Sequence, residues 1–110
     1  MKEFTLTDEL DNKTLFRLGK NAQENHQLID EADKLDWWFH LSEYASGHCI
    51  VEKENLTKEE IIYAANLVKE NSKYNNFKKL KICYTQIKNI KKTKKPGEVI
   101  ILKTPEIITL

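Results

Sequence analysis

A chain of 110 residues is expected to form one domain over residues 1–110, with enough interior to fold without disulfides. Its 40% hydrophobic and 32% charged residues exclude an intrinsically disordered protein, and no apolar stretch approaches the roughly 20 residues of a membrane helix. The formal net charge is only +1, which excludes a uniformly basic or acidic protein.

The first third of the chain predicts a hairpin followed by a helix. Residues 4–7 and 14–18 alternate in hydrophobicity around a polar turn, as paired strands do. Asn21, followed three residues later by Glu24, is typical of a capping box and predicts a helix that runs towards Ala32. The apolar face of this helix is thin, so its packing surface is expected to be small.

An aromatic strand and its partner are expected next. Residues 36–41 predict a buried strand, and residues 48–51 predict a strand paired with it. Trp37 and Phe39 fall on one face of the first strand, because side chains alternate along a strand. Trp38 and His40 then lie together on the opposite face. One of the two faces is expected to be core, and at most one is available to a ligand.

The second half of the chain predicts a second helix and three more strands. Thr57 and Glu60 form a capping box, and apolar residues then follow at helical spacing to an expected end near Ser72. The strands are expected at residues 80–84, 98–102 and 106–109, with Pro96-Gly97 as the turn before the second of them. The fold class is therefore expected to be α+β, with a mixed or antiparallel sheet and two helices.

Neither catalysis nor a cofactor is suggested by the residue pattern. No nucleophile with a base and no carboxylate pair stands out, so we expect no enzyme. The histidines and cysteines (His26, His40, His48, Cys49 and Cys83) do not have the spacing of zinc ligands, and three glycines are too few for a phosphate-binding loop. We therefore expect no metal and no cofactor.

The two cysteines and the N-terminus both indicate a cytoplasmic protein. Cys49 and Cys83 lie in apolar, strand-like contexts, which favours reduced thiols that pack in the interior over a disulfide. The N-terminus has no apolar core of the kind found in a secretion signal.

The positive charge is concentrated in one segment. Lys78 to Lys95 contains eight lysines and no acid, whereas the rest of the chain has ten basic and seventeen acidic residues. Such a distribution is typical of a protein that binds a polyanion. A solvated surface in a chain with a general bias towards lysine, asparagine and isoleucine explains the lysines equally well, but not the absence of acids.

Gly19-Lys20-Asn21 marks a second candidate contact with an anion. A glycine before a helix start leaves backbone amides exposed, the helix dipole favours an anion there, and Lys20 adds a charge. An ordinary capped helix beside a solvated lysine is the alternative. The aromatic run from Trp37 to His40 likewise has two interpretations, a base-stacking surface or a part of the core.

Several motifs, in order along nearly the whole chain, resemble the NFACT-R family of RNA-binding domains found in NEMF-type proteins of ribosome-associated quality control. They are Gly19-Lys20-Asn21 with Asn25, Asp36 with Trp38-Phe39-His40, Ser46-Gly47-His48, Ala65 to Val68 with Asn71-Ser72, Tyr84-Thr85, Lys91-Lys92 and Pro96-Gly97. The second helix resembles most the short eukaryotic type that carries a coiled-coil tail, although no such tail appears in these residues.

The resemblance implies an RNA-binding module, with tRNA or ribosomal RNA as the partner and ribosome association as a possible setting. The candidate RNA-contacting residues are Lys20, Asn21, Asn25, His40, His48, Lys88, Lys91, Lys92, Lys94 and Lys95. For the two histidines, a structural role is an equal alternative. The rival hypothesis is a protein-interaction module whose basic segment binds an acidic partner. The sequence does not identify the RNA, the oligomeric state or the pathway.

Overall fold

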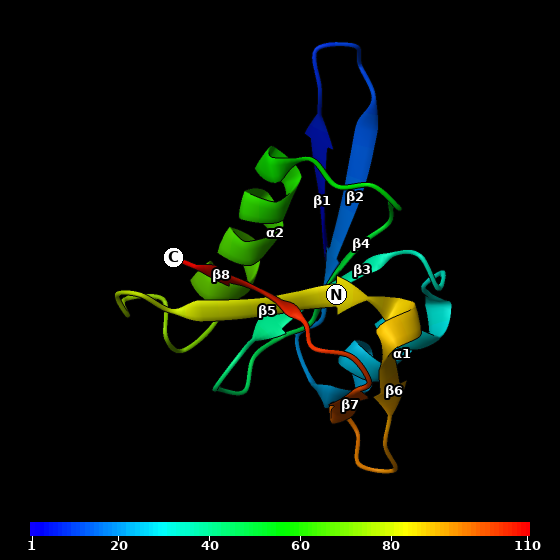
Figure 1. The fold of residues 1–110 in the computed structure, drawn as a ribbon, viewed down its shortest axis with the longest axis vertical. Coiled ribbons are helices and arrows are strands. Elements are labelled where there is room, and N and C mark those ends of the chain that lie inside the picture. The colour runs from blue at the N-terminus through cyan, green and yellow to red at the C-terminus, as the bar shows by residue number, and fades with distance from the viewer.

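A computed structural model describes residues 1–110 and shows a six-stranded sheet, a two-stranded sheet and two α-helices (Figure 1). The larger sheet contains β1 (Lys2–Thr7), β2 (Lys13–Leu18), β3 (Trp37–Leu41), β4 (Cys49–Val51), β5 (Lys81–Gln86) and β8 (Glu106–Thr109). The helices are α1 (Ala22–Glu31) and α2 (Lys58–Glu70). A 3-10 turn, η1 (Ile87–Asn89), leads into the small sheet of β6 (Ile90–Lys92) and β7 (Val99–Ile101).

The large sheet has the order β1-β2-β4-β3-β5-β8, and every neighbouring pair is antiparallel. The predicted α+β class is therefore confirmed, and of the two sheet types expected the antiparallel one is observed. The chain places β4 between β2 and β3, so that β3 pairs with β4 on one side and β5 on the other. No helix of the structure has both the length and the apolar character needed to span a bilayer.

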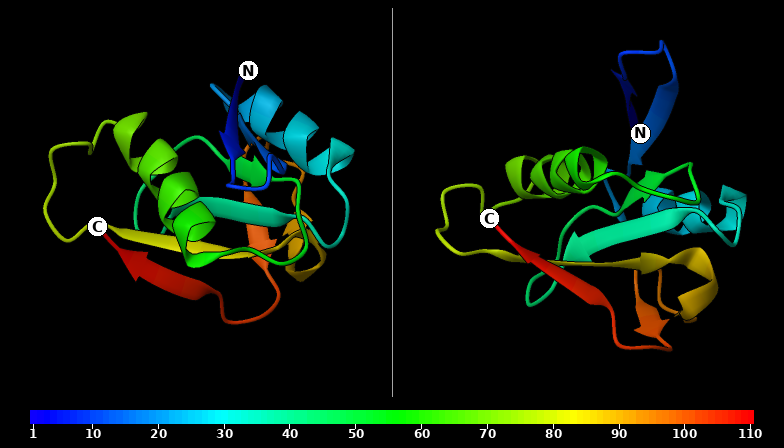
Figure 2. Two further views of the ribbon diagram at one scale, coloured as in Figure 1. Left: turned by 90° about the horizontal axis from the view of Figure 1, so that it is seen from above. Right: turned by 45° about the horizontal axis from the view of Figure 1, so that its top comes forward.

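The α2 face of the sheet carries the larger hydrophobic core. Phe16, Phe39 and Val51 are fully buried there, together with Ala64 and Ala65 of α2. The two alanines allow the helix to approach the sheet closely, because a methyl group is the smallest side chain that α2 could present. Figure 2 shows α2 lying along this face, with the β6–β7 hairpin on the opposite side of the sheet.

The α1 face carries a second, smaller core. Leu28 and Ile29 of α1 pack with Trp38, Ile50 and the residues of η1 and β6. Alternation along the strands explains the division, since Trp38 and Ile50 are register partners whose neighbours Phe39 and Cys49 lie in the other core. At most one face of β3 was expected to be available to a ligand, and in the structure both faces of the strand are covered, by one core each. The Trp37–His40 run is therefore not an open base-stacking surface.

Both thiols are buried and free, as predicted, and they lie in different cores. Cys49 belongs to the α2 core and Cys83 to the α1 core. Burial raises the pKa of both thiols, so neither is readily ionised.

The start of α2 is as predicted, and the start of α1 differs from the prediction in one hydrogen bond. At α2, Thr57 accepts from the Glu60 N–H and the Glu60 carboxylate accepts from the Thr57 N–H, so the capping box is confirmed. At α1, Asn21 accepts from the Glu24 N–H at 2.9 Å, but the Glu24 carboxylate accepts from the N–H of Lys20 instead. Half of the predicted box is therefore formed, and the second bond is moved back by one residue.

The sequence predicted no helix or strand between residues 84 and 98, and the structure has η1 followed by β6 there. Ile87 and Ile90 anchor it in the α1 core, while the lysines between and after them face outward. Pro96-Gly97 forms the turn before β7 as expected, and Gly97 has a φ of 82° that L-residues rarely adopt.

Candidate nucleic-acid interface

The start of α1 packs tightly against the β3–β4 loop. Asn25 is buried, and its Oδ1 accepts a hydrogen bond of 3.0 Å from the backbone N–H of His48. A Cβ at Gly19 would lie 2.1 Å from that oxygen, and a Cβ at Gly47 would lie 2.4 Å from the Gly19 carbonyl oxygen. Neither position has space for a side chain. Asn25 is thus a structural tie between α1 and the loop, and its oxygen is already occupied.

Lys20 and Asn21 are exposed at the same corner. The Glu24 carboxylate accepts from the Lys20 backbone N–H at 3.0 Å and pairs with the Met1 amino group at 2.9 Å. The hydrogen bond from the terminal amino group is the main reason that the pKa of Glu24 lies below its usual value. The Lys20 ammonium itself makes no ion pair, so its charge is available to an anion in solvent.

The two predicted histidine contacts lie side by side but differ in access. The ring centroids of His40 and His48 are 5.0 Å apart, and His40 stacks on Trp38 at 5.5 Å. His48 is only 1% exposed, and burial lowers its pKa to about 3. Burial also lowers the pKa of His40, which is half-buried. Both rings are therefore uncharged at neutral pH. The near-complete burial of the His48 side chain favours the structural role that the sequence left as an alternative to RNA contact.

A groove lies between the start of α1, the β3–β4 loop and the β6–β7 hairpin. It consists of two adjoining hollows of about 430 Å³ and about 410 Å³. His40, Ala45, Pro96 and Gly97 line both of them, so the two hollows are continuous. Lys20 lines the first hollow, and Lys95, together with the buried Trp38 and His48, lines the second.

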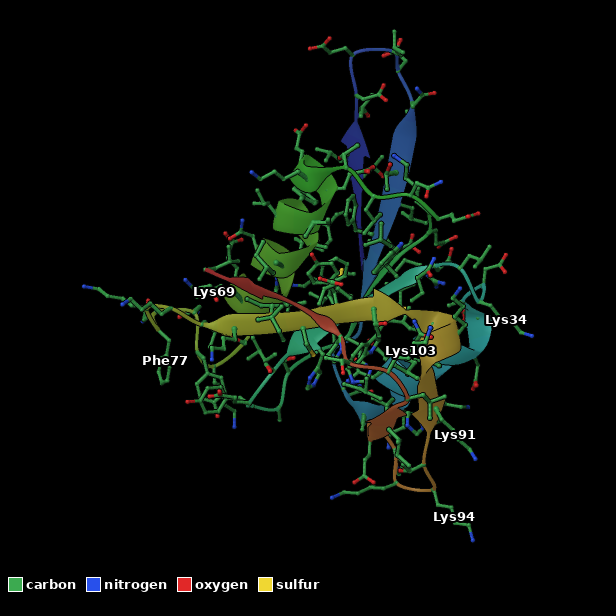
Figure 3. The ribbon with its side chains drawn as sticks, viewed as in Figure 1. Lys34, Lys69, Phe77, Lys91, Lys94 and Lys103 are labelled. Carbon is green, nitrogen blue, oxygen red and sulfur yellow. The ribbon has the colours of Figure 1, made fainter.

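The lysines of the basic segment divide into two groups at opposite ends of β5. At the hairpin end, the exposed lysines that make no ion pair are Lys88, Lys91, Lys94 and Lys95. Lys92 is different, because its ammonium pairs with Asp30 of α1. The other group consists of Lys78, Lys79 and Lys81. Figure 3 shows this separation, with Lys91 and Lys94 at the hairpin and Phe77, next to Lys78, at a distant corner.

The sequence comparisons decide the family. A sequence model described as the NFACT protein RNA binding domain matches residues 3–103 of this chain. The chain belongs to this family. Coiled-coil domain-containing protein 25 from Bos taurus and that from Mus musculus are each 37% identical, and the protein of that name from Danio rerio is 35% identical. Each match covers 69% of this chain and 40% of the relative, so the chain spans well under half of these relatives.

The fold of this NFACT-R domain also occurs in a solved structure. The C-terminal part of the fibronectin/fibrinogen-binding protein from Streptococcus suis superposes with a TM-score of 0.85 at 22% identity. The superposition covers 100% of this chain and 45% of the other. It includes β8, which lies beyond the part matched by the family's sequence model.

The structure brings together some of the predicted site residues of this NFACT-R domain. Lys20, Asn21, Asn25 and His40 line the first hollow, and Lys95 lies beside the second. Lys88, Lys91 and Lys94 project from η1 and the hairpin outside the two hollows. The motif glycines, Asn25 and His48 hold the backbone that forms the groove, and Lys20 and Lys95 place free charges in its lining. No three His, Cys, Asp or Glu side chains meet as they would around a metal ion.

Sequence reasoning did not single out one further part of the surface. Tyr44, Tyr74 and Phe77 form a cluster next to Lys78 and Lys79. The short spacing of Tyr74, Phe77 and the two lysines is a signal that aromatic and basic residues lie together. Tyr44 comes from a separate loop, so its presence there could not be predicted from local spacing.

Proposed function

We propose that this domain binds RNA of the tRNA or ribosomal RNA class by contacts with the phosphate backbone around the groove. Family membership supports RNA as the ligand. The observation that supports these particular residues is that Lys20, Lys91, Lys94 and Lys95 are exposed and make no ion pair. A lysine without an acidic partner can neutralise a phosphate and release counterions, which is the main source of affinity for a nucleic acid backbone.

The rim of the groove suits this role better than its interior does. Asn21 and Ala22 line the first hollow at the positive end of the α1 dipole, where a phosphate is favoured. His40 and His48 carry no charge at neutral pH, so they add no electrostatic attraction. Affinity is therefore expected to depend strongly on salt and little on sequence. We further propose a cytoplasmic, non-catalytic role in translation or in ribosome quality control.

The test is the salt dependence of tRNA binding by a triple variant, Lys91→Ala, Lys94→Ala and Lys95→Ala. Each lost phosphate contact should flatten the slope of log affinity against log salt by about 0.7 to 0.9. We expect affinity to fall for all RNA sequences and the slope to flatten by about 1 to 3.

The matched control changes three exposed lysines elsewhere, Lys13→Ala, Lys34→Ala and Lys58→Ala, which removes the same charge. Lys92 is left intact because it holds Asp30. Equal effects in the two triple variants would show that only net charge matters. A domain that fails to bind tRNA at physiological salt but binds an acidic peptide would instead support the rival hypothesis of a protein-interaction module.

A further inference from the structure

Three aromatic side chains meet at the surface far from the sheet interior. Tyr44 belongs to the β3–β4 loop, and Tyr74 and Phe77 belong to the loop after α2. The rings of Tyr44 and Tyr74 are stacked, with centroids 4.2 Å apart and planes 24° apart. Phe77 meets both rings edge-on, at 5.1 Å from Tyr74 and 5.9 Å from Tyr44. We call these three residues the aromatic trio.

Two of the three rings are more exposed than the other aromatic side chains of the protein. The chain has ten aromatic residues, and the two that are classed as exposed are Tyr44, at 37%, and Phe77, at 47%. Tyr74 is half-buried against the α2 core, so it anchors the other two to the body of the domain. Large apolar rings held in place at the surface lose contact with water when a ligand covers them, which makes them suited to binding.

The charges around the trio are mainly positive. Phe77, Lys78, Lys79 and Lys81 line a third hollow of about 240 Å³ together with Tyr44. The lysines are exposed and make no ion pair, and Glu43 is the one acid in the lining. Aromatic rings beside free lysines are the combination by which proteins bind single-stranded nucleic acids, since the rings stack on bases and the lysines contact phosphates.

The trio also adjoins the groove. Tyr74 lines the first hollow together with Lys73, and Tyr44 lines the second. An RNA strand whose phosphates lie along the rim near Lys20 can therefore continue to the trio without leaving the surface. This position would place bases on the rings only where they are not paired, because a duplex hides the faces of its bases.

We propose that the aromatic trio is a stacking surface for unpaired bases of the bound RNA, with Lys73, Lys78 and Lys79 at the neighbouring phosphates. The proposal rests on the proposed function, since it assumes that RNA is the ligand. It adds a preference for single-stranded over duplex RNA, which the lysines of the hairpin cannot supply because they contact only phosphates. Single-stranded ends or loops bind at the trio, whereas duplex binds only through charge.

The experiment compares an unstructured 12-nucleotide RNA with a blunt RNA duplex of 12 base pairs. Tyr44→Ala and Phe77→Ala should each weaken binding of the single strand by roughly 5- to 100-fold, as the loss of one stacked base does. Duplex binding and the salt slope should not change, because no charge is removed. Phe77→Trp, which keeps an aromatic ring at this position, should bind the single strand as the wild type does. Lys78→Ala with Lys79→Ala should instead flatten the salt slope.

The control is Ile107→Ala, which removes a side chain of the same 47% exposure from β8. It should leave both RNAs unaffected. Thermal melting of each variant shows that the fold is intact, and Tyr74 is left unchanged because it packs on the core. Unchanged single-strand binding by both aromatic variants, or an equal loss on duplex, overturns the stacking surface while tRNA binding by the wild type preserves the proposed function. If the wild type binds no RNA, both proposals are wrong.

Discussion

The two faces of the central sheet differ in how completely their buried polar groups are paired. On the α2 face, the carboxylate of Glu60 is 5% exposed and accepts from the Thr14 hydroxyl, from Lys53 at 2.9 Å and from the Thr57 N–H at 2.8 Å. Burial alone would raise the pKa of Glu60, but these hydrogen bonds outweigh it and hold the pKa below its usual value. Every buried donor and acceptor around this carboxylate is satisfied.

On the α1 face, the indole Nε1 of Trp38 and the Nδ1 of His48 are buried without a hydrogen-bond partner. A buried polar atom left unpaired costs about 1 to 3 kcal/mol. Among the motif residues, Asn25, Trp38 and His48 lie on this same face. The α2 face is thus a fully paired core, whereas the two unpaired atoms of the α1 face belong to residues that also line the second hollow of the groove.

The largest loss of stability is expected where the backbones of Gly19 and Gly47 are in contact. A Cβ at Gly47 would meet the Gly19 carbonyl oxygen at 2.4 Å, and this backbone cannot rotate away as a side chain could. Gly47→Ala should therefore lower the free energy of unfolding by about 3 kcal/mol or more, through overpacking and the loss of the Asn25–His48 bond. Urea unfolding measures the change. Lys13→Ala is the exposed control, expected within about 0.5 kcal/mol. A stable Gly47→Ala variant would mean that the loop can move without cost.

A smaller loss of stability is expected when the pH is lowered. The His48 pKa is about 3 in the folded protein and near 6.5 in the unfolded chain, so folding excludes a proton. The contribution of the uncharged His48 ring to stability should be fully present above about pH 6.5 and should be lost as the pH falls towards 3. One such group makes the protein about 2 kcal/mol less stable at pH 5 than at pH 7. Measured by urea unfolding, His48→Gln should flatten this dependence, leaving the part due to His40, whose pKa is also lowered by burial.

Glu60→Gln is the matched variant on the other face. Because the pKa of Glu60 is lowered, its contribution is present above its usual value of 4.5 and is lost only as the pH falls below that. Between pH 7 and pH 5, Glu60→Gln should keep the slope of the wild type. If His48→Gln also keeps that slope, the acid sensitivity does not come from the α1 face.

The smallest effect is expected at the start of α1. Asn21→Ala removes the cap on the Glu24 N–H and should lower the free energy of unfolding by about 1 kcal/mol. Lys20→Ala should change it by less than about 0.5 kcal/mol, because its side chain makes no bond, and yet should weaken tRNA binding. Melting temperature and the tRNA dissociation constant, measured on both variants, give this crossed pattern. Intact binding by Lys20→Ala would reduce the motif to an ordinary helix start.

Local signals in the sequence predicted the elements well. The Thr57–Glu60 box, the β1–β2 hairpin and the bounds of β8 all follow from patterns within a few residues, and the structure confirms them. The segment at residues 87–92 was missed, because isoleucines among lysines do not reveal whether they have a core to enter. That core is formed by the sheet together with α1, which lies more than 50 residues earlier in the chain.

The candidate site was less predictable than the fold. Sequence could propose Lys20 and the basic segment, but not that Lys92 pairs with Asp30, since that contact depends on how the hairpin meets α1. The enclosure of His48 depends on the same packing. Tyr44 and Tyr74 are 30 positions apart and meet only because the β3–β4 loop and the loop after α2 lie at the same end of the sheet.

The strand β5 sets a distance between the two groups of lysines that RNA must cover to reach both. Its six residues rise about 3.3 Å each, so the strand keeps Lys81 and η1 at least about 17 Å apart. A stacked single strand advances about 3.4 Å per nucleotide and needs about five nucleotides for that span. Shorter oligonucleotides can occupy only one end at a time. Longer ones gain the second contact within the same molecule, so the affinity of this small domain should depend on the length of its ligand as that of a two-site receptor does.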